Sequence, residues 1–147
     1  GFDATGIEIN AKLAAYGKKH MGCAIVGGME ELKAAQFDVG FAWHVLEHFT
    51  DLTKIFSDLN RALKPKGYLI LGVPNFDWDQ FGEKNLSLIG AIHPLGFSSE
   101  FFLKNLPRHG FSIQGLFEDV RDFQDKPCRI SRNKDGIIVW ARKEEGG

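Results

Sequence analysis

The sequence predicts an α/β protein with a doubly wound, mostly parallel sheet that ends in an antiparallel strand pair. Short apolar runs alternate with amphipathic stretches of helical period through most of the chain. Two more apolar runs, 111–117 and 137–141, come last and are separated by a polar segment. Alternating strands and helices favour a parallel sheet covered on both faces, whereas two strands joined without a crossover helix can pair antiparallel.

The N-terminal part is expected to fold as strand, helix and strand. Residues 4–9 carry isoleucines in alternation, as a short strand does. Asn10 is a suitable N-cap for the amphipathic stretch that follows, and Gly22 is a suitable residue to end that helix. The apolar residues 23–26 then form a second short strand, which ends at a pair of glycines.

The middle of the chain carries the clearest helix, between two buried strands. The run 37–43 is apolar enough for a buried strand, and the Thr-Asp pair at 50–51 can cap the helix behind it. The apolar face of this helix consists of Leu52, Ile55, Phe56, Leu59, Ala62 and Leu63. The segment 64–67, Lys-Pro-Lys-Gly, is expected to end the helix, and 68–73 is predicted as the next strand.

Residues 74–97 have no regular period and are longer than an ordinary connection in a compact domain. We expect a lid or substrate-binding insertion there. Ser98 or Ser99 then caps a short helix, which Pro107 should kink or end before Gly110.

Composition narrows the classes of function. The 147 residues suit a single domain, 1–147, and 18 Lys and Arg nearly cancel 19 Asp and Glu to give a charge of -1. Nucleic acid is not expected as a partner, because binding it needs a basic face. No apolar run approaches the roughly 20 residues that cross a membrane, and the sequence does not start like a signal peptide.

The cysteines indicate a reducing environment. Cys23 and Cys128 form neither a disulfide framework nor a pattern with zinc-ligand spacing. We therefore expect a cytoplasmic protein. The absence of a basic excess favours a small-molecule substrate.

Doubly wound sheets bind ligands at the carboxyl ends of their strands. Glu8 follows the first strand, where an acidic side chain in nucleotide-binding domains accepts hydrogen bonds from both ribose hydroxyls. A solvated glutamate at the start of a helix explains the same residue equally well.

Four segments carry motifs in a recognisable order along the chain. They are GIEI at 6–9, FDVGFAWHVLEH at 37–48, LKPKGYLILGVPN at 63–75 and HPLGFSSEFFLKNLPRHGF at 93–111. In these motifs the chain resembles the class I S-adenosylmethionine-dependent methyltransferases, in particular the enzymes that methylate small molecules on oxygen or carbon. The resemblance implies the Rossmann-like methyltransferase fold, S-adenosylmethionine as the cofactor and methyl transfer to a small-molecule acceptor.

The resemblance also implies a set of cofactor-binding residues. They are Glu8, Ile9, Gly28, Met29, Glu30, Ala42, Trp43 and His44. Met29 can pack on adenine through its soft sulfur, or it can fill the core. Trp43 can face the adenine or the positive sulfonium, or it can be an ordinary core side chain.

Two departures from the family pattern bear on cofactor binding. The family's first strand and glycine-rich loop should precede Gly1, so the sheet is expected to be N-terminally incomplete. Gly28 stands where the family carries a side chain that holds the adenine amino group. Because these groups are missing, we expect weak cofactor binding and little activity from the chain alone.

The absent strand would lie between the strand that ends at Glu8 and the strand that ends at Trp43. Its absence exposes two apolar edges. We expect the chain to close this gap directly, to pair there with another copy as a homodimer, or to be completed by further chain.

The protein mainly has to align the reactants for an in-line methyl transfer, and it supplies a base where the acceptor must lose a proton. His93 and His44 are the candidate bases. The candidate substrate-binding residues are Phe76, Trp78, Phe81 and Phe97. Aromatic side chains in a lid can equally pack among themselves.

The segment 44–48, His-Val-Leu-Glu-His, has the i, i+4 histidine spacing of some metal sites. The sequence offers no evident third ligand, and the family resemblance already accounts for the motif. We therefore expect no metal there, and we expect His48 to hydrogen-bond within the fold.

Two other classes of function stay open. An NAD-dependent oxidoreductase shares the acidic residue after a strand, but it should carry a GxGxxG motif upstream. A non-catalytic binding module of methyltransferase ancestry would keep the sheet and lose the pocket, and Gly28 favours it. The acceptor atom, whether oxygen, nitrogen or carbon, is not identified by the sequence, because specificity resides in the lid.

Overall fold

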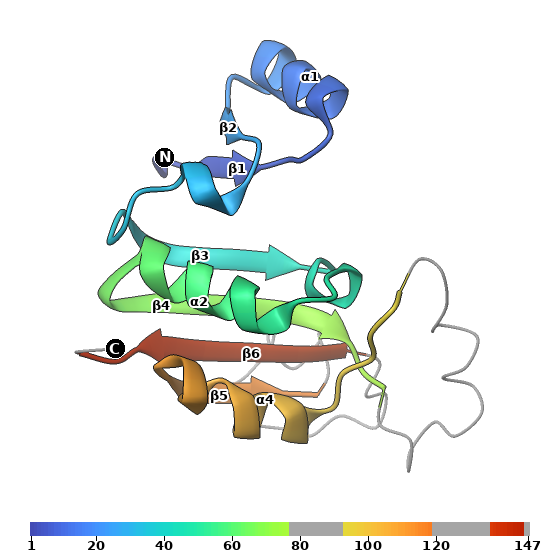
Figure 1. Cartoon of the computed structure of the whole chain (residues 1–147), viewed down its shortest axis with the longest axis vertical. Coiled ribbons are helices and arrows are strands. Elements are labelled where there is room, and N and C mark those ends of the chain that lie inside the picture. Colours follow the sequence, from blue (N-terminus) through green and yellow to red (C-terminus); the bar gives the residue numbers. More distant parts are fainter. Residues whose placement is uncertain (77–92, 119–135, 146–147) are drawn as a thin grey trace.

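The computed structural model describes residues 1–76, 93–118 and 136–145. Its strands are β1 (Thr5–Ile7), β2 (Ala24–Val26), β3 (Phe37–Trp43), β4 (Leu63–Pro74), β5 (Phe111–Phe117) and β6 (Gly136–Lys143). Its α-helices are α1 (Ala11–Met21), α2 (Leu52–Ala62) and α4 (Ser99–Asn105). Short 3-10 turns lie at η1 (Met29–Glu31), η2 (Leu46–His48) and η4 (Pro107–His109). Strands and helices alternate over the first half of the chain, as predicted (Figure 1).

The strands form two sheets. The larger sheet has the order β3-β4-β6-β5, and the smaller one contains β1 and β2. β4 runs parallel to β3 and antiparallel to β6, and β5 also pairs with β6 in the antiparallel sense. The predicted α/β class and the final antiparallel strands are therefore confirmed.

The helix ends follow the capping chemistry read from the sequence. Asn10 accepts hydrogen bonds from two backbone N–H groups in the first turn of α1, and Gly22 ends that helix in the left-handed conformation, with φ of 64°. Asp51 caps α2 by accepting from a backbone N–H, and Ser98 caps α4 in the same way. These four predicted caps are confirmed.

The boundary between α2 and β4 differs from the prediction. Leu63, expected as the last residue on the apolar face of the helix, is the first residue of β4 and lies opposite Phe37 in the parallel pairing. The segment 64–67 is a local irregularity in the strand, since the register between β3 and β4 shifts there. Gly67 is required at this point because a Cβ atom would lie 2.9 Å from the carbonyl oxygen of Lys64.

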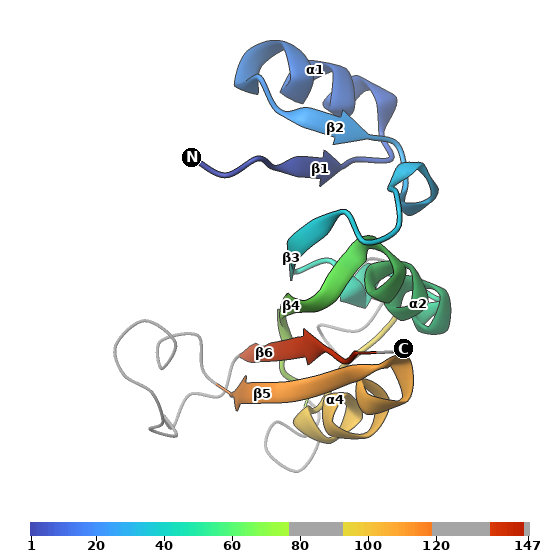
Figure 2. The same cartoon turned by 90° about the vertical axis from the view of Figure 1, so that its left-hand side faces the viewer.

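The hydrophobic core lies between the larger sheet and the helices α2 and α4, which cover the same face of that sheet (Figures 1 and 2). Its fully buried members include Leu46, Phe56, Leu69, Leu71, Phe97, Phe102, Phe111, Ile137 and Val139. The apolar run predicted for β4 thus supplies the centre of this core.

The two sheets are not joined. β1 pairs only with β2, and β3 pairs only with β4, within the part of the chain that the structure describes. The predicted gap between β1 and β3 is therefore present, and the two strands do not close it by pairing directly. Val39 and Phe41 on β3 are 51% and 66% exposed as a result.

None of the described helices is long and apolar enough to cross a membrane.

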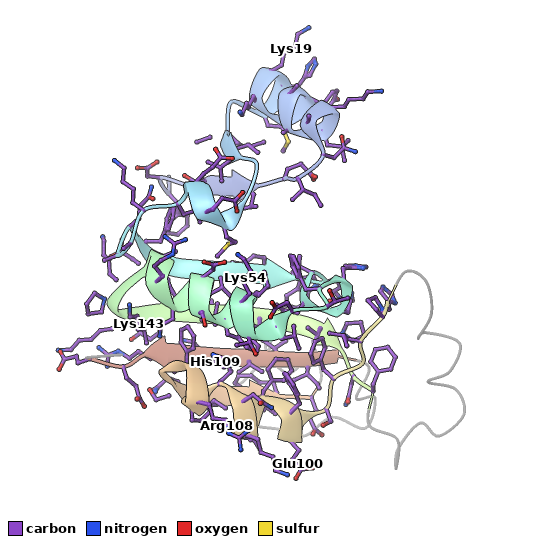
Figure 3. The ribbon with its side chains drawn as sticks, in the orientation of Figure 1. Lys19, Lys54, Glu100, Arg108, His109 and Lys143 are labelled. Atoms are coloured by element: carbon purple, nitrogen blue, oxygen red, sulfur yellow. The ribbon has the colours of Figure 1, made fainter. Side chains whose placement is uncertain are left out.

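Lys143 ties the end of β6 to the end of α2. Its ammonium group donates to the carbonyl oxygens of Asn60 at 2.8 Å and Leu63 at 3.1 Å, and the residue is only 9% exposed (Figure 3). The last carbonyls of a helix have no partner within the helix, and a cation there also interacts favourably with the helix dipole. This long-range contact fixes α2 on the sheet.

We predict that Lys143→Met lowers the free energy of unfolding by about 1–3 kcal/mol, because two buried carbonyl groups lose their donor. Urea denaturation followed by circular dichroism measures the effect. Lys104→Met is the matched control, since Lys104 is exposed and forms only a surface ion pair with Glu100, of which the loss costs less than about 1 kcal/mol. Equal effects of the two substitutions would contradict this account of Lys143.

Candidate cofactor and acceptor site

β1 and β2 are parallel, so their carboxyl ends lie at the same edge of the smaller sheet. In the view of Figure 1 the arrowheads of β1 and β3 both point to the right. The carboxyl ends of the strands are where doubly wound sheets bind ligands.

Glu8 is held at the end of β1. Its backbone N–H donates to the carbonyl oxygen of Val26 at 3.0 Å, and its carboxylate Oε1 accepts from the backbone N–H of Asn10 at 2.8 Å. The second carboxylate oxygen has no hydrogen-bond partner among the described residues. Glu8 thus orders the start of α1 with one carboxylate oxygen and leaves the other as an acceptor for a ligand. Its role at the start of the helix is therefore compatible with binding a ribose hydroxyl. The neighbouring Ile9 is 83% exposed.

The loop after β2 is ordered by its own side chains and by α2. The backbone N–H of Gly27 donates to Glu31 Oε1 at 2.8 Å. The Arg61 guanidinium donates to the carbonyl oxygens of Met29 at 2.8 Å and Leu32 at 2.6 Å. The sequence did not point to Arg61, because an arginine on a solvated helix face has no distinctive pattern. Its contacts fix the η1 turn and with it Met29.

Met29 lines a cleft of about 110 Å³ between the two sheets. Ile7 of β1 and Phe41 of β3 line the same cleft. Gly28 is buried beside this turn, and a Cβ atom on it would lie 2.3 Å from the Glu30 carboxylate. These atoms are the end of the flexible, exposed Glu30 side chain, which can move aside, so the contact does not by itself require glycine at position 28.

Trp43 ends β3 and lies over β4. A Cβ atom on Gly72 would lie 2.3 Å from the Trp43 ring, so only glycine leaves room for the indole. The Trp43 ring also stacks on Phe41, with the centroids 6.1 Å apart. The preceding Ala42 is half-buried, and its partner in β4 is Leu71.

His44 turns the chain out of β3 in a left-handed conformation, with φ of 51°. A non-glycine residue in this conformation is uncommon and is found preferentially at functional sites. Its backbone N–H donates to the carbonyl oxygen of Gly72 at 2.8 Å, and its side chain is 53% exposed. His44 Nδ1 lies 3.5 Å from Oε1 of Glu47.

Glu47 is completely buried, and neither of its carboxylate oxygens has a hydrogen-bond partner in the described part of the chain. Sequence analysis treated this residue as part of a structural motif. The burial of a charged residue in a short turn has no sequence signal of its own.

His93 lies beside the η2 turn. Its ring centroid is 5.0 Å from that of His48, and the backbone N–H of Leu95 donates to the carbonyl oxygen of Glu47 at 3.4 Å. The structure thus brings together His48 and His93, which are far apart in the sequence.

Of the four aromatic residues predicted to bind the substrate, two are buried and two lie outside the described residues. Phe97 is 2% exposed and packs its ring 5.1 Å from Phe101, inside the core. Phe76 is 9% exposed and fills the space beside Gly96, where a Cβ atom would lie 2.7 Å from its ring. Trp78, Phe81 and most of the expected lid, 77–92, lie outside the described residues.

Sequence comparison identifies related proteins. Residues 1–71 match the family model described as a methyltransferase domain. The ubiquinone biosynthesis O-methyltransferase of Bradyrhizobium sp. (strain ORS 278) is 29% identical over 112 residues, which are 74% of this chain and 39% of that protein. The protein of the same name from Rhodopseudomonas palustris (strain TIE-1) is 28% identical over 110 residues, with the same coverage. The chain therefore spans 39% of the length of these curated relatives.

Solved structures agree with the sequence match. An S-adenosylmethionine-dependent methyltransferase from Mesorhizobium loti superimposes with a TM-score of 0.66 at 16% identity, over 95% of this chain and 79% of that one. A methyltransferase of the same kind from Archaeoglobus fulgidus gives a TM-score of 0.67 at 17% identity, over 95% and 75% of the two chains. These superpositions define the class: the chain has the Rossmann-like methyltransferase fold.

Over residues 1–71 the chain matches the family model of a methyltransferase domain, and its fold is that of S-adenosylmethionine-dependent methyltransferases. The resemblance read from the motifs is confirmed.

The position of Trp43 depends on Gly72, and we predict that Gly72→Ala destabilises the chain by about 1–3 kcal/mol, because the added methyl group forces the indole to move. Near-ultraviolet circular dichroism should change together with the free energy of unfolding. Gly40→Ala on the neighbouring strand is the control, since its Cβ atom would meet Leu69 only at 3.4 Å. An unchanged tryptophan spectrum in Gly72→Ala would contradict the assigned position of Trp43.

Proposed function

We propose that this chain forms part of an enzyme that transfers a methyl group from S-adenosylmethionine to a hydroxyl oxygen of a small molecule. The observation that supports the proposal is that Glu8, Met29 and Trp43 lie at or just beyond the carboxyl ends of β1, β2 and β3, in a chain of methyltransferase sequence and fold. The hydroxyl acceptor is suggested by the two curated relatives, which are O-methyltransferases.

The adenosine part of the cofactor fits these residues. The free carboxylate oxygen of Glu8 can accept from a ribose hydroxyl, and Met29 offers its side chain to the adenine from the cleft between the sheets. Trp43 can attract the positive sulfonium by a cation–π interaction of roughly 0.5–2 kcal/mol. When bound, S-adenosylmethionine supplies an activated methyl group on its sulfonium.

The remaining task of the chain is to align the acceptor and to take up its proton. An in-line approach of the hydroxyl oxygen gains its rate from orientation. His44, with an exposed side chain directly after Trp43, and His93, beside the η2 turn, are the two candidate bases. Phe76 and Phe97 are buried and would then support the acceptor site as packing residues.

The near-neutral charge supports a small molecule and not a nucleic acid as the acceptor. We also propose a cytoplasmic location, on the two cysteines of the sequence. The exposed Val39 and Phe41 on the unpaired edge of β3 support a homodimer formed through this edge.

Binding of S-adenosylhomocysteine tests the proposal. We predict that isothermal titration detects binding to the chain and that Glu8→Gln weakens it roughly tenfold, because a hydrogen bond to a charged acceptor contributes about 1.5 kcal/mol or more. Glu100→Gln is the matched control, since Glu100 is exposed on α4 and pairs only with Lys104.

NAD is titrated in parallel. Binding of NAD in preference to S-adenosylhomocysteine would replace the proposal with an oxidoreductase. Binding of neither would favour a non-catalytic module, and equal affinities of Glu8→Gln and Glu100→Gln would remove Glu8 from the site.

A further inference from the structure

We propose that Glu47, His48 and His93 bind a divalent transition-metal ion. One ligand atom from each of these side chains lies within 4.8 Å of the other two. It is the one group of this kind among the residues that the structure describes. Two of the ligands come from the η2 turn, and the third comes from the segment that leads to α4.

The backbone holds these two segments together. The N–H of Leu95 donates to the carbonyl oxygen of Glu47 at 3.4 Å, and the N–H of Phe76 donates to the carbonyl oxygen of Phe97 at 2.8 Å. Phe97 is itself anchored in the core. The position of His93 next to η2 is therefore fixed by contacts that do not involve its imidazole.

Glu47 provides an independent reason to expect a cation. Its side chain is 0% exposed, and both carboxylate oxygens are buried without a hydrogen-bond donor in the described ranges. A buried carboxylate without donors is costly. His44 Nδ1 stands 3.5 Å from Oε1 on a side chain that is half exposed. An ion bound between Glu47 and the two histidines would supply the positive charge that the buried carboxylate lacks.

The distances allow an ion with small movements. Bonds of roughly 2.1 Å in a tetrahedral arrangement hold ligand atoms about 3.4 Å apart. The ligand atoms of the three side chains lie within 4.8 Å of one another. Side-chain rotations that move these atoms by on the order of 1 Å would bring them to the separation that a tetrahedral site needs. The imidazole rings are already tilted by 46° to each other and do not stack.

The donor set selects the kind of ion. Two imidazole nitrogens and one carboxylate oxygen suit Zn²⁺ and other first-row transition metals, whereas Mg²⁺ prefers oxygen ligands alone. Three protein ligands leave at least one coordination position open, as in catalytic rather than structural zinc sites.

The location gives the ion a role, which rests on the proposed function. The η2 turn follows directly after Trp43 and His44, so the ion would lie where the acceptor meets the methyl group. A hydroxyl bound to the ion loses its proton to water or to a nearby base more readily. Its oxygen then forms the new O–C bond while the S–C bond breaks, and the sulfonium becomes a neutral thioether.

Metal binding is tested on the chain after treatment with a chelator, in a Cys23→Ser background that removes an exposed thiol. We predict that isothermal titration with Zn²⁺ shows one site and that Mg²⁺ gives no saturable heat. Glu47→Gln and His93→Ala should each weaken Zn²⁺ binding at least tenfold. His20→Ala is the matched control, because His20 lies at the exposed end of α1, where its ring contacts Tyr16.

Thermal unfolding keeps the test independent of folding defects. Zn²⁺ should raise the Tm of the Cys23→Ser chain and of His20→Ala, and it should leave the Tm of folded Glu47→Gln unchanged. Unchanged Zn²⁺ affinity in both Glu47→Gln and His93→Ala would overturn the proposal, as would the absence of a Zn²⁺ effect on all variants.

The two proposals fail separately. Zn²⁺ binding without binding of S-adenosylhomocysteine would keep the metal site and reject the proposed function. Binding of S-adenosylhomocysteine without Zn²⁺ binding would keep the proposed function and reject the metal site.

Discussion

The structure depends on β4, the one strand of the larger sheet that joins its parallel and antiparallel parts. β4 pairs with β3 on one side and with β6 on the other. Leu69 and Leu71 point from it into the core under α2, while Gly72 on the same strand leaves room for the Trp43 indole. Its end at Pro74 leads to Phe76, whose backbone hydrogen bond holds the segment 93–97 against the sheet. The positions of Trp43 and His93 therefore both follow from the pairing of one buried strand.

The gap between β1 and β3 divides the candidate site between the two sheets. Glu8 and Met29 follow the two strands of the smaller sheet, whereas Trp43 ends β3 of the larger sheet and His48 lies in the η2 turn behind it. The cleft between the sheets is lined from both sides, by Ile7 and Met29 and by Phe41. Burial of apolar edges is the main driving force for strand association, so whatever pairs with β3 also sets the distance between the two halves of the site.

Much of the fold could be predicted because local signals agree with tertiary packing. Asn10, Gly22, Asp51 and Ser98 cap their helices as their side chains and backbone preferences dictate. The start of β4 was mispredicted because Leu63 satisfies both the helix face and the strand pairing, and only the contact with Phe37 decides between them.

The site was less predictable, since it depends on contacts between distant segments. Sequence motifs pointed to Glu8, Met29 and Trp43 as candidates, but they could not show that Glu47 is buried or that His93 lies beside His48. The third ligand that the metal hypothesis lacked comes from 45 residues further along the chain.

The central claim is that the adenosine of the cofactor binds at Met29, and methionine labelling tests it most directly. The chain contains two methionines, Met21 and Met29, and Met21 is 73% exposed at the far end of α1. In a sample labelled with ¹³C on the methionine methyl groups, saturating S-adenosylhomocysteine should shift the Met29 signal and give a nuclear Overhauser effect to the adenine protons. The Met21 signal should stay in place and serves as the internal control. A Met29 signal that does not move while calorimetry records binding would contradict the account.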